Sequence, residues 1–351
     1  MIDNRLTMLS MIERHCTVTA AAEALHYSPS TVSHQVKQLA TELGVVLLEQ
    51  RGRNIRLTPA AHSLLGHVDV MSAEWERALA DLDAYSTTVT GSITLSAFST
   101  AASILLPQTM RALNEEFPHL ATQTIEAEPS ECYDLLLAGD VDLGIVAVTT
   151  DTPAGSDDRF AQQFLIDDPL DLMVPLDHHL ADRSSVSIAD AREETWILGR
   201  PGTTYHQLVI ANCASAGFTP RIGHYANDWN TGTALVHDGF GVCVASRLSR
   251  SQDLHPVRRI PLTGEHAPTR HIAAVTRAGA QDRRTIRFAL DLLTRETQNV
   301  MEQLGRDLGD RWPRSRGTSV AAGCRPAARP DDPTADNDCP AGRSLSDTTE
   351  A

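Results

Sequence analysis

The first residues of the chain show apolar positions at helical spacing, separated by residues that start or stop helices. A helix is predicted over 4–15, because its apolar residues recur every three positions. A short Ala-rich helix is predicted over 20–25, with Thr19 as its N-cap. His26 and Tyr27 then form a turn before the next helix.

A third helix begins at Ser28-Pro29, where an N-cap residue precedes a proline at the first helical position. It is predicted to end before Gly44, which supplies the C-terminal stop. Its apolar stripe consists of Val32, Val36, Leu39 and Leu43. Two helices joined by a short turn, the second with a polar outer face, are typical of a helix-turn-helix.

The outer face of this third helix carries donors of the kind that read base edges in the major groove. Such an apolar stripe is more often that of an ordinary amphipathic helix whose polar face is only solvated. Here the capped start, the preceding Ala-rich helix and a basic segment after it favour DNA binding. The residues expected to contact DNA are Ser28, Pro29, Ser30, Ser33, His34, Lys37 and Gln38.

The basic segment over 50–57 is predicted to form a hairpin with a turn at Gly52. Arg51 and Arg53 flank this glycine, so the hairpin resembles a wing whose arginines reach a phosphate or the minor groove. The alternative is a surface loop that happens to be basic.

A long helix is predicted to start at Thr58-Pro59 and to run to about residue 85. Its apolar residues alternate at spacings of four and three, which is a heptad seam sustained over three repeats. So narrow a seam suits a partner helix, although packing against its own chain is the alternative. The expected dimerisation residues are Leu64, Val68, Met71, Trp75 and Leu82.

From Gly91 onward the pattern alternates between strands and helices, which predicts an α/β body with largely parallel sheets. Strands are expected over 92–97, 122–127, 142–148, 170–174, 195–198, 221–225, 241–245 and 270–275. Helices are expected over 104–117, 130–138, 204–216, 230–237 and 281–300. A ligand would bind where the carboxyl ends of strands face helix N-termini.

The length and composition of the chain indicate the number of domains and how charge is distributed among them. The 351 residues suffice for two to three domains, and the net charge of −15 argues at first against a nucleic-acid partner. Residues 1–60, however, hold six basic and five acidic side chains, whereas 91–312 hold 18 basic and 29 acidic ones. An acidic body can therefore carry an N-terminal module that binds DNA. Residues 313–351 lack aromatic residues and are expected to be disordered.

The run TAAAEALHYSPSTVSHQVKQLATELGVVLLEQRGRNIRLTPA resembles LysR-type transcriptional regulators, and it follows their winged helix-turn-helix pattern nearly throughout. The segments GSITLSAF, LLPQTMRALNEEFPHL, LLLAGDVDLGIV and ALVHDGFGVCVASR are similar to their effector-binding domain. The resemblance implies two Rossmann-like subdomains joined by two crossover strands, built like periplasmic binding proteins. It also implies dimers or tetramers on DNA, with an inducer in the cleft between the subdomains.

By this resemblance the chain divides into four parts. These are a winged helix-turn-helix domain over 1–58, a linker and dimerisation helix over 59–90, an effector-binding domain over 91–300 and a C-terminal extension over 301–351. Subdomain I would comprise about 91–165 and 270–300, and subdomain II about 166–269.

The effector residues are inferred from this implied geometry and from local chemistry. Hydroxyls and free backbone N–H groups at helix N-termini bind carboxylates well, which favours a small organic anion. Two carboxylates near the same mouth leave a neutral or cationic ligand as the alternative. The expected effector-binding residues are Ser99, Thr100, Glu128, Ser130, Arg200, Gly202, Thr203, Asn227 and Asp228.

Other classes of site and protein fit less well. The chain has no G-x-S-x-G, Walker or H-E-x-x-H motif, so we expect no enzyme and no cofactor. The pair His178-His179 and the pair His62/His67 lack helical ligand spacing, so no metal site is expected. The residues expected to be buried, inert thiols are Cys132, Cys213 and Cys243.

The sequence thus predicts a regulator that binds a partly palindromic promoter site and responds to a small molecule. We expect it to act in a reducing cytoplasm, without a membrane span, and to contact DNA, an effector, further copies of itself and RNA polymerase. The alternatives are a transcription factor without a ligand and an α/β binding protein without a DNA role.

Overall fold

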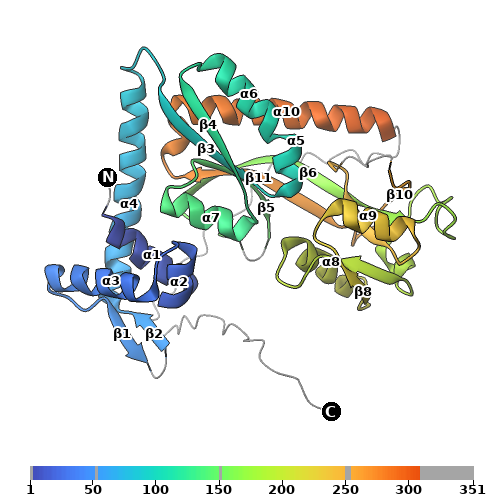
Figure 1. Ribbon diagram of the computed structural model, residues 1–351, viewed down its shortest axis with the longest axis horizontal. Helices are drawn as coiled ribbons and strands as arrows, with labels where there is room; N and C mark the ends of the chain where they lie inside the picture. Colours follow the sequence, from blue (N-terminus) through green and yellow to red (C-terminus); the bar gives the residue numbers. More distant parts are fainter. Residues whose placement is uncertain (1–2, 52–53, 150–151, 250–253, 309–351) are drawn as a thin grey trace.

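The chain folds into a small helical head, one long helix and a larger α/β body (Figure 1). The computed structural model describes residues 3–51, 54–149, 152–249 and 254–308. The tail predicted to be disordered lies outside the described residues. Within those ranges, no helix is both long and apolar enough to cross a membrane.

The head consists of α1 (Asn4–His15), α2 (Val18–Ala24), α3 (Pro29–Leu43), β1 (Leu48–Arg51) and β2 (Asn54–Leu57). The three predicted helices and the hairpin are confirmed. Helix α3 begins where Ser28 Oγ accepts a hydrogen bond from the Thr31 N–H at 3.1 Å. It ends at Gly44, whose φ of +67° is the left-handed conformation that favours glycine.

Two details of the head differ from the prediction. Helix α2 is capped by Thr17 and not by Thr19, because the Thr17 backbone is extended and its Oγ1 accepts a hydrogen bond from the Ala20 N–H at 3.1 Å. The helix therefore begins two residues earlier than expected. Leu43 is exposed and does not belong to the core, because the buried face of α3 ends at Leu39.

The long helix is α4 (Pro59–Asp83), which connects the head to the body (Figure 1). Its first turns pack against the core of the head through Ala61 and Leu65. Further along, the Ala73 carbonyl oxygen faces Gly279 of the body so closely that a Cβ on this glycine would lie 2.4 Å from it. With a φ of +88° as well, this position requires glycine for the helix to lie against the body.

The main sheet of the body has the strand order β10-β6-β11-β5-β3-β4, and β9 also pairs with β6. Its strands are β3 (Gly91–Ala97), β4 (Leu120–Glu126), β5 (Leu143–Val148), β6 (Phe160–Val174), β9 (Cys243–Ser246), β10 (Arg258–Pro261) and β11 (Thr269–Arg277). A second, two-stranded sheet pairs β7 (Thr195–Leu198) with β8 (Arg221–Tyr225) in parallel.

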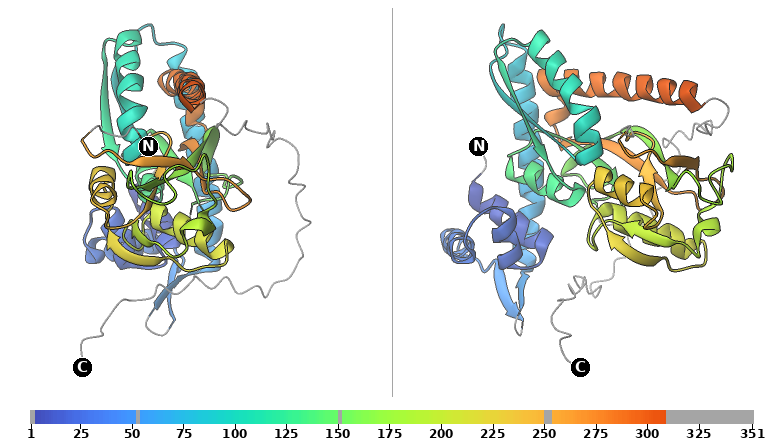
Figure 2. Two further views of the ribbon diagram at one scale, coloured as in Figure 1. Left: turned by 90° about the vertical axis from the view of Figure 1, so that its right-hand side faces the viewer. Right: turned by 45° about the vertical axis from the view of Figure 1, so that its right-hand side comes forward.

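The helices of the body cover these sheets. They are α5 (Ser99–Ile104), α6 (Leu106–Glu116), α7 (Pro129–Ala138), α8 (Thr204–Ser215), α9 (Trp229–His237) and α10 (Arg284–Leu308), with two 3-10 turns, η1 (Ile188–Ala191) and η2 (Ala280–Asp282). Helix α10 begins beside α4, where the Arg284 N–H donates to Asp83 Oδ2 at 3.1 Å, and it extends away from the head (Figure 2).

The prediction of a largely parallel sheet is wrong, because the main sheet of the body is mixed. Strands β3, β4 and β5 are parallel, but β11 runs antiparallel to both β5 and β6. The predicted strand over 170–174 is the end of the much longer β6, and β10 was not predicted. The helix expected over 104–117 is two helices, since α5 precedes α6 with a break at Leu105.

Strands β6 and β11 connect the two halves of the body, which have separate hydrophobic cores. One core lies between β3, β5, α6 and α10, and the other lies around β7, α8 and the end of β6. At the junction Asp168 of β6 is buried and accepts hydrogen bonds from Arg270 of β11, at 2.8 Å from Nε and 2.5 Å from Nη2. Ser246 Oγ also donates to Asp168 at 2.8 Å, so this carboxylate ties three strands together.

Candidate DNA-binding surface and ligand cavity

Helix α3 lies at the outside of the head (Figure 1), and the residues predicted to contact DNA are exposed along it. The opposite face of α3 is buried, with Val32 and Val36 almost inaccessible to solvent. The exposed residues are Ser28, Pro29, Ser30, Ser33, His34, Lys37 and Gln38. Because the caps fix both ends of the helix, these side chains are presented on a rigid element.

The hairpin beside α3 is a two-stranded antiparallel ladder in which Glu49 faces Arg56. Arg51 is the last residue of β1, and Arg53 lies outside the described residues. Arg56 is an exposed cation on β2 that the sequence analysis did not include among the wing contacts, although it belongs to the same basic segment.

The two halves of the predicted dimerisation seam differ in their exposure to solvent. Leu64 is half-buried because it packs against the core of its own head, and Val68, further along α4, is buried within the chain. A buried Val68 offers no surface to a partner helix in this arrangement of the chain, whereas the assignment of Leu64 stays a prediction. Met71, Trp75 and Leu82 are 49%, 46% and 62% exposed, so the C-terminal half of the seam remains open to a partner.

A cavity of about 180 Å³ lies between the two halves of the body, next to the junction of β6 and β11. Five of the predicted effector residues line it: Ser99, Thr100, Glu128, Thr203 and Asn227. They come from the ends of β3, β4, β7 and β8, which confirms that strand ends and helix starts meet here.

Four predicted effector residues lie outside the lining, namely Ser130, Arg200, Gly202 and Asp228. Asp228 instead caps α9, because its Oδ1 accepts a hydrogen bond from the Thr231 N–H at 2.9 Å. The Ser130 carbonyl faces the head and accepts a hydrogen bond from Arg14. The Arg200 side chain is exposed, and its backbone contributes instead: the N–H donates to Asn227 Oδ1 at 2.8 Å, and the carbonyl accepts a hydrogen bond from Thr203 Oγ1 at 2.8 Å.

Aromatic residues that the sequence analysis did not select dominate the remaining wall, in particular Phe98, Tyr205 and Trp229. Trp229 Nε1 donates to Thr100 Oγ1 at 3.1 Å, and this bond crosses from one half of the body to the other. Tyr205 OH donates to the Val244 carbonyl at 2.9 Å, and burial raises the pKa of this phenol well above its usual value. Tyr205 and Trp229 pack edge to face, with ring centroids 5.0 Å apart.

Arg270 is the cation of the cavity wall, and it was also not selected. Its guanidinium lies 4.9 Å from the centroid of the Phe98 ring and is paired with the buried Asp168. The charge that this arginine can offer a ligand is therefore largely neutralised. Thr203 is the N-cap of α8, whereas Ser99 caps no helix, because it is the first residue of α5.

The three expected inert cysteines are confirmed as buried, free thiols. Burial raises the pKa of Cys132, Cys213 and Cys243 to about 12 in each case. At neutral pH they are protonated, which makes them poor nucleophiles.

Family models match nearly the whole described chain. Residues 4–62 match the bacterial regulatory helix-turn-helix protein of the lysR family, and residues 86–298 match the LysR substrate binding domain. The chain belongs to the LysR family of transcriptional regulators. This finding explains why a capped, exposed α3 and a cavity between two α/β halves occur in one chain.

Individual LysR-family relatives agree with this assignment. The transcriptional dual regulator GltC of Bacillus subtilis is 30% identical over 213 residues, which are 61% of this chain and 70% of that protein. A hydrogen peroxide-inducible genes activator of Pectobacterium carotovorum is 27% identical and covers 86% of this chain and 98% of its own length. Among solved structures, a full-length OxyR variant from Pseudomonas aeruginosa has a TM-score of 0.56 at 22% identity, covering 84% and 94% of the two chains. Full-length BenM has a TM-score of 0.52 at 20% identity, covering 87% and 98%.

Replacing Lys37 tests the assignment of the exposed face of α3. We expect Lys37→Ala to weaken binding to a specific duplex by about 1–3 kcal/mol if the ammonium group reads a guanine. If it contacts phosphate alone, the loss is the same on every sequence and the salt dependence becomes flatter. Fluorescence anisotropy at several salt concentrations measures both, with Arg111→Ala, an exposed cation on α6, as the control. Unchanged affinity of Lys37→Ala on specific and random duplexes would contradict the assignment.

Proposed function

We propose that this LysR-family chain binds a partly palindromic promoter site and changes its DNA binding when a small molecule occupies the cavity. Phosphate contacts would supply most of the affinity, and the exposed face of α3 would supply sequence preference. The observation that carries the proposal is that one helix, α7, connects the cavity with the DNA-binding head.

The N-terminus of α7 belongs to the cavity. Glu128, its N-cap residue, and Pro129, its first residue, both line the cavity wall. A ligand that contacts either residue therefore acts directly on the start of a ten-residue helix. Because a helix moves largely as a unit, such a contact is transmitted to its other turns.

The next turns of α7 hold the head. Arg14 of α1 forms an ion pair with Asp134 through Nε, and its Nη2 donates to the Ser130 carbonyl at 3.0 Å. His15 Nε2 lies 3.1 Å from the other Asp134 oxygen. Leu137 adds an apolar contact, since it packs against the core of the head. The position of the head is thus coupled to the position of α7 by ionic and apolar contacts together.

For the ligand we propose a small organic anion with a flat apolar body. The rings of Phe98, Tyr205 and Trp229 suit such a body, and the Thr100 hydroxyl, which accepts a hydrogen bond from Trp229 and keeps its own proton to donate, suits a carboxylate. The start of α8 adds backbone N–H groups near the same wall.

A neutral ligand of the same shape is the second candidate, and two observations favour it. Glu128 brings a carboxylate to the lining, and the charge of Arg270 is already neutralised by Asp168. Wherever the ligand carries no charge, hydrogen bonds to hydroxyls alone would orient it.

The remaining parts of the proposal concern partners. We propose a homodimer formed along the exposed half of α4, a tetramer as a pair of such dimers, and RNA polymerase as a further contact at the promoter. The proposed role needs no catalysis, cofactor or membrane attachment, and bacterial promoter DNA places it in the cytoplasm. One relative is named a transcriptional dual regulator and another a genes activator, which supports the regulatory role.

Selection from a pool of random DNA duplexes tests the DNA-binding function without knowledge of the target gene. We expect the full chain to enrich duplexes with two related half-sites in inverted orientation, because a two-fold symmetric dimer presents α3 twice. Recovery of duplexes without any shared sequence, at a salt concentration that removes non-specific binding, would contradict the proposal.

A charge within the exposed half of the seam tests the dimer. Trp75→Glu places a carboxylate at the centre of the proposed helix pair, where it would be desolvated without a partner. We expect the dimer dissociation constant, measured by sedimentation equilibrium, to rise at least about tenfold. Leu254→Glu, at an apolar residue of the body that is 74% exposed, serves as the control. A Trp75→Glu protein that sediments like the original chain would show that the interface lies elsewhere.

A further inference from the structure

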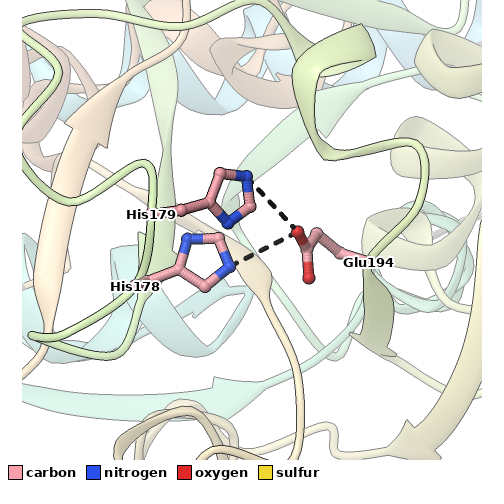
Figure 3. A group of neighbouring side chains, drawn as sticks. All are labelled: His178, His179 and Glu194. Atoms are coloured by element: carbon pink, nitrogen blue, oxygen red, sulfur yellow. Dashed lines mark ion pairs between the residues drawn. The ribbon is translucent and has the colours of Figure 1, made fainter.

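A cluster of three metal-binding side chains lies in subdomain II, apart from the DNA-binding face and the cavity lining. His178 and His179 belong to the turns that follow β6, and Glu194 directly precedes β7. Figure 3 shows both imidazole rings and the carboxylate converging from these two segments. The histidine pair was expected to bind no metal because its spacing does not fit two ligands along one helix, whereas the third side chain, Glu194, comes from a separate segment.

The distances within the cluster match those between the ligands of a tetrahedral ion. Glu194 Oε1 lies 3.4 Å from His178 Nε2 and 3.8 Å from His179 Nε2, and the three ligand atoms lie within 4.8 Å of one another. Metal–nitrogen bonds of about 2.0–2.1 Å place neighbouring ligands of a tetrahedral zinc ion roughly 3.3–3.4 Å apart. Small rotations of the two rings, whose centroids are 4.3 Å apart, would therefore complete the geometry.

We propose that His178, His179 and Glu194 bind a divalent transition-metal ion, with zinc as the best match, and that solvent fills the remaining position. Two imidazoles and one carboxylate suit zinc, nickel and copper, whereas magnesium and calcium prefer oxygen ligands alone. Three protein ligands with an open fourth position form a known type of zinc coordination.

The three side chains differ in their exposure: two are held by the protein, and the third is open to solvent. The side chains of His178 and Glu194 are 13% and 24% exposed, so the protein fixes them, while that of His179 is 65% exposed. An ion can therefore arrive from solvent through the His179 side. Leu180 and Ala181, which follow the pair, belong to the core of subdomain II and hold the turn in place.

One hydrogen bond must change when the ion binds. The Leu180 N–H donates to His178 Nδ1 at 3.3 Å, which leaves the proton of the neutral ring on Nε2. Coordination through Nε2 requires the other tautomer, so a single long hydrogen bond is exchanged for a metal–nitrogen bond. The bound ion would then link the turn after β6 to the start of β7 and stabilise subdomain II.

Zinc binding to the full chain, freed of metal by a chelator and then by dialysis, tests this site. Isothermal titration with zinc chloride should show a site that His179→Ala weakens at least about tenfold, the size of effect expected when a zinc ligand is lost. His271→Ala is the matched control, because His271 has a side chain 62% exposed and contacts one carboxylate, that of Asp167. We expect this control to bind zinc like the original chain.

A second measurement protects the test against folding defects. Zinc should raise the melting temperature of the original chain and of His271→Ala, and it should raise that of His179→Ala and Glu194→Gln much less. Magnesium at the same concentration should leave all four melting temperatures unchanged. Zinc affinity and zinc-dependent stabilisation that are equal in His179→Ala and the original chain would overturn the proposed site, whatever the DNA-binding properties of the protein.

Discussion

The position of the DNA-binding head relative to the ligand cavity depends on the contact between Arg14 of α1 and Asp134 of α7. The two side chains are only 13% and 12% exposed, so their charges are partly desolvated and each requires the other. His15 shares the same carboxylate, and the Arg14 guanidinium lies 5.7 Å from the centroid of the Tyr133 ring. Because α7 begins at the cavity wall, this contact connects the cavity with the head through one helix.

The cavity itself is set by the pairing of β6 with β11. These strands run through the junction of the two halves, and the buried pair of Asp168 and Arg270 fixes their register there. Removing either partner would leave an uncompensated buried charge, which is strongly destabilising. The same pair also shapes the electrostatics of the cavity, since Asp168 largely neutralises the positive charge that Arg270 brings to the cavity wall.

The head could be predicted almost completely from the sequence, because local signals specify it. The cap at Ser28, the stop at Gly44 and the stripe of Val32 and Val36 act within one helix. The cavity was predicted only in part, because its aromatic wall joins Phe98 to Tyr205 and Trp229, and no local pattern indicates that distant residues meet. The contact of Glu194 with the histidine pair was not predicted either, because these residues are also distant in the sequence. The heptad pattern did not show that Val68 is buried within its own chain, since a helical stripe does not distinguish packing against a partner chain from packing within one chain.

The coupling between head and body is tested most directly by a double-mutant cycle on Arg14 and Asp134. Amide hydrogen exchange of α1 gives the free energy of local unfolding of this helix, which includes the loss of its contact with α7, in the original chain, Arg14→Ala, Asp134→Ala and the double variant. If α7 holds the head through this pair, the two substitutions are non-additive, with a coupling energy of about 1–3 kcal/mol. Additive effects, with no coupling energy between the two residues, would contradict the account.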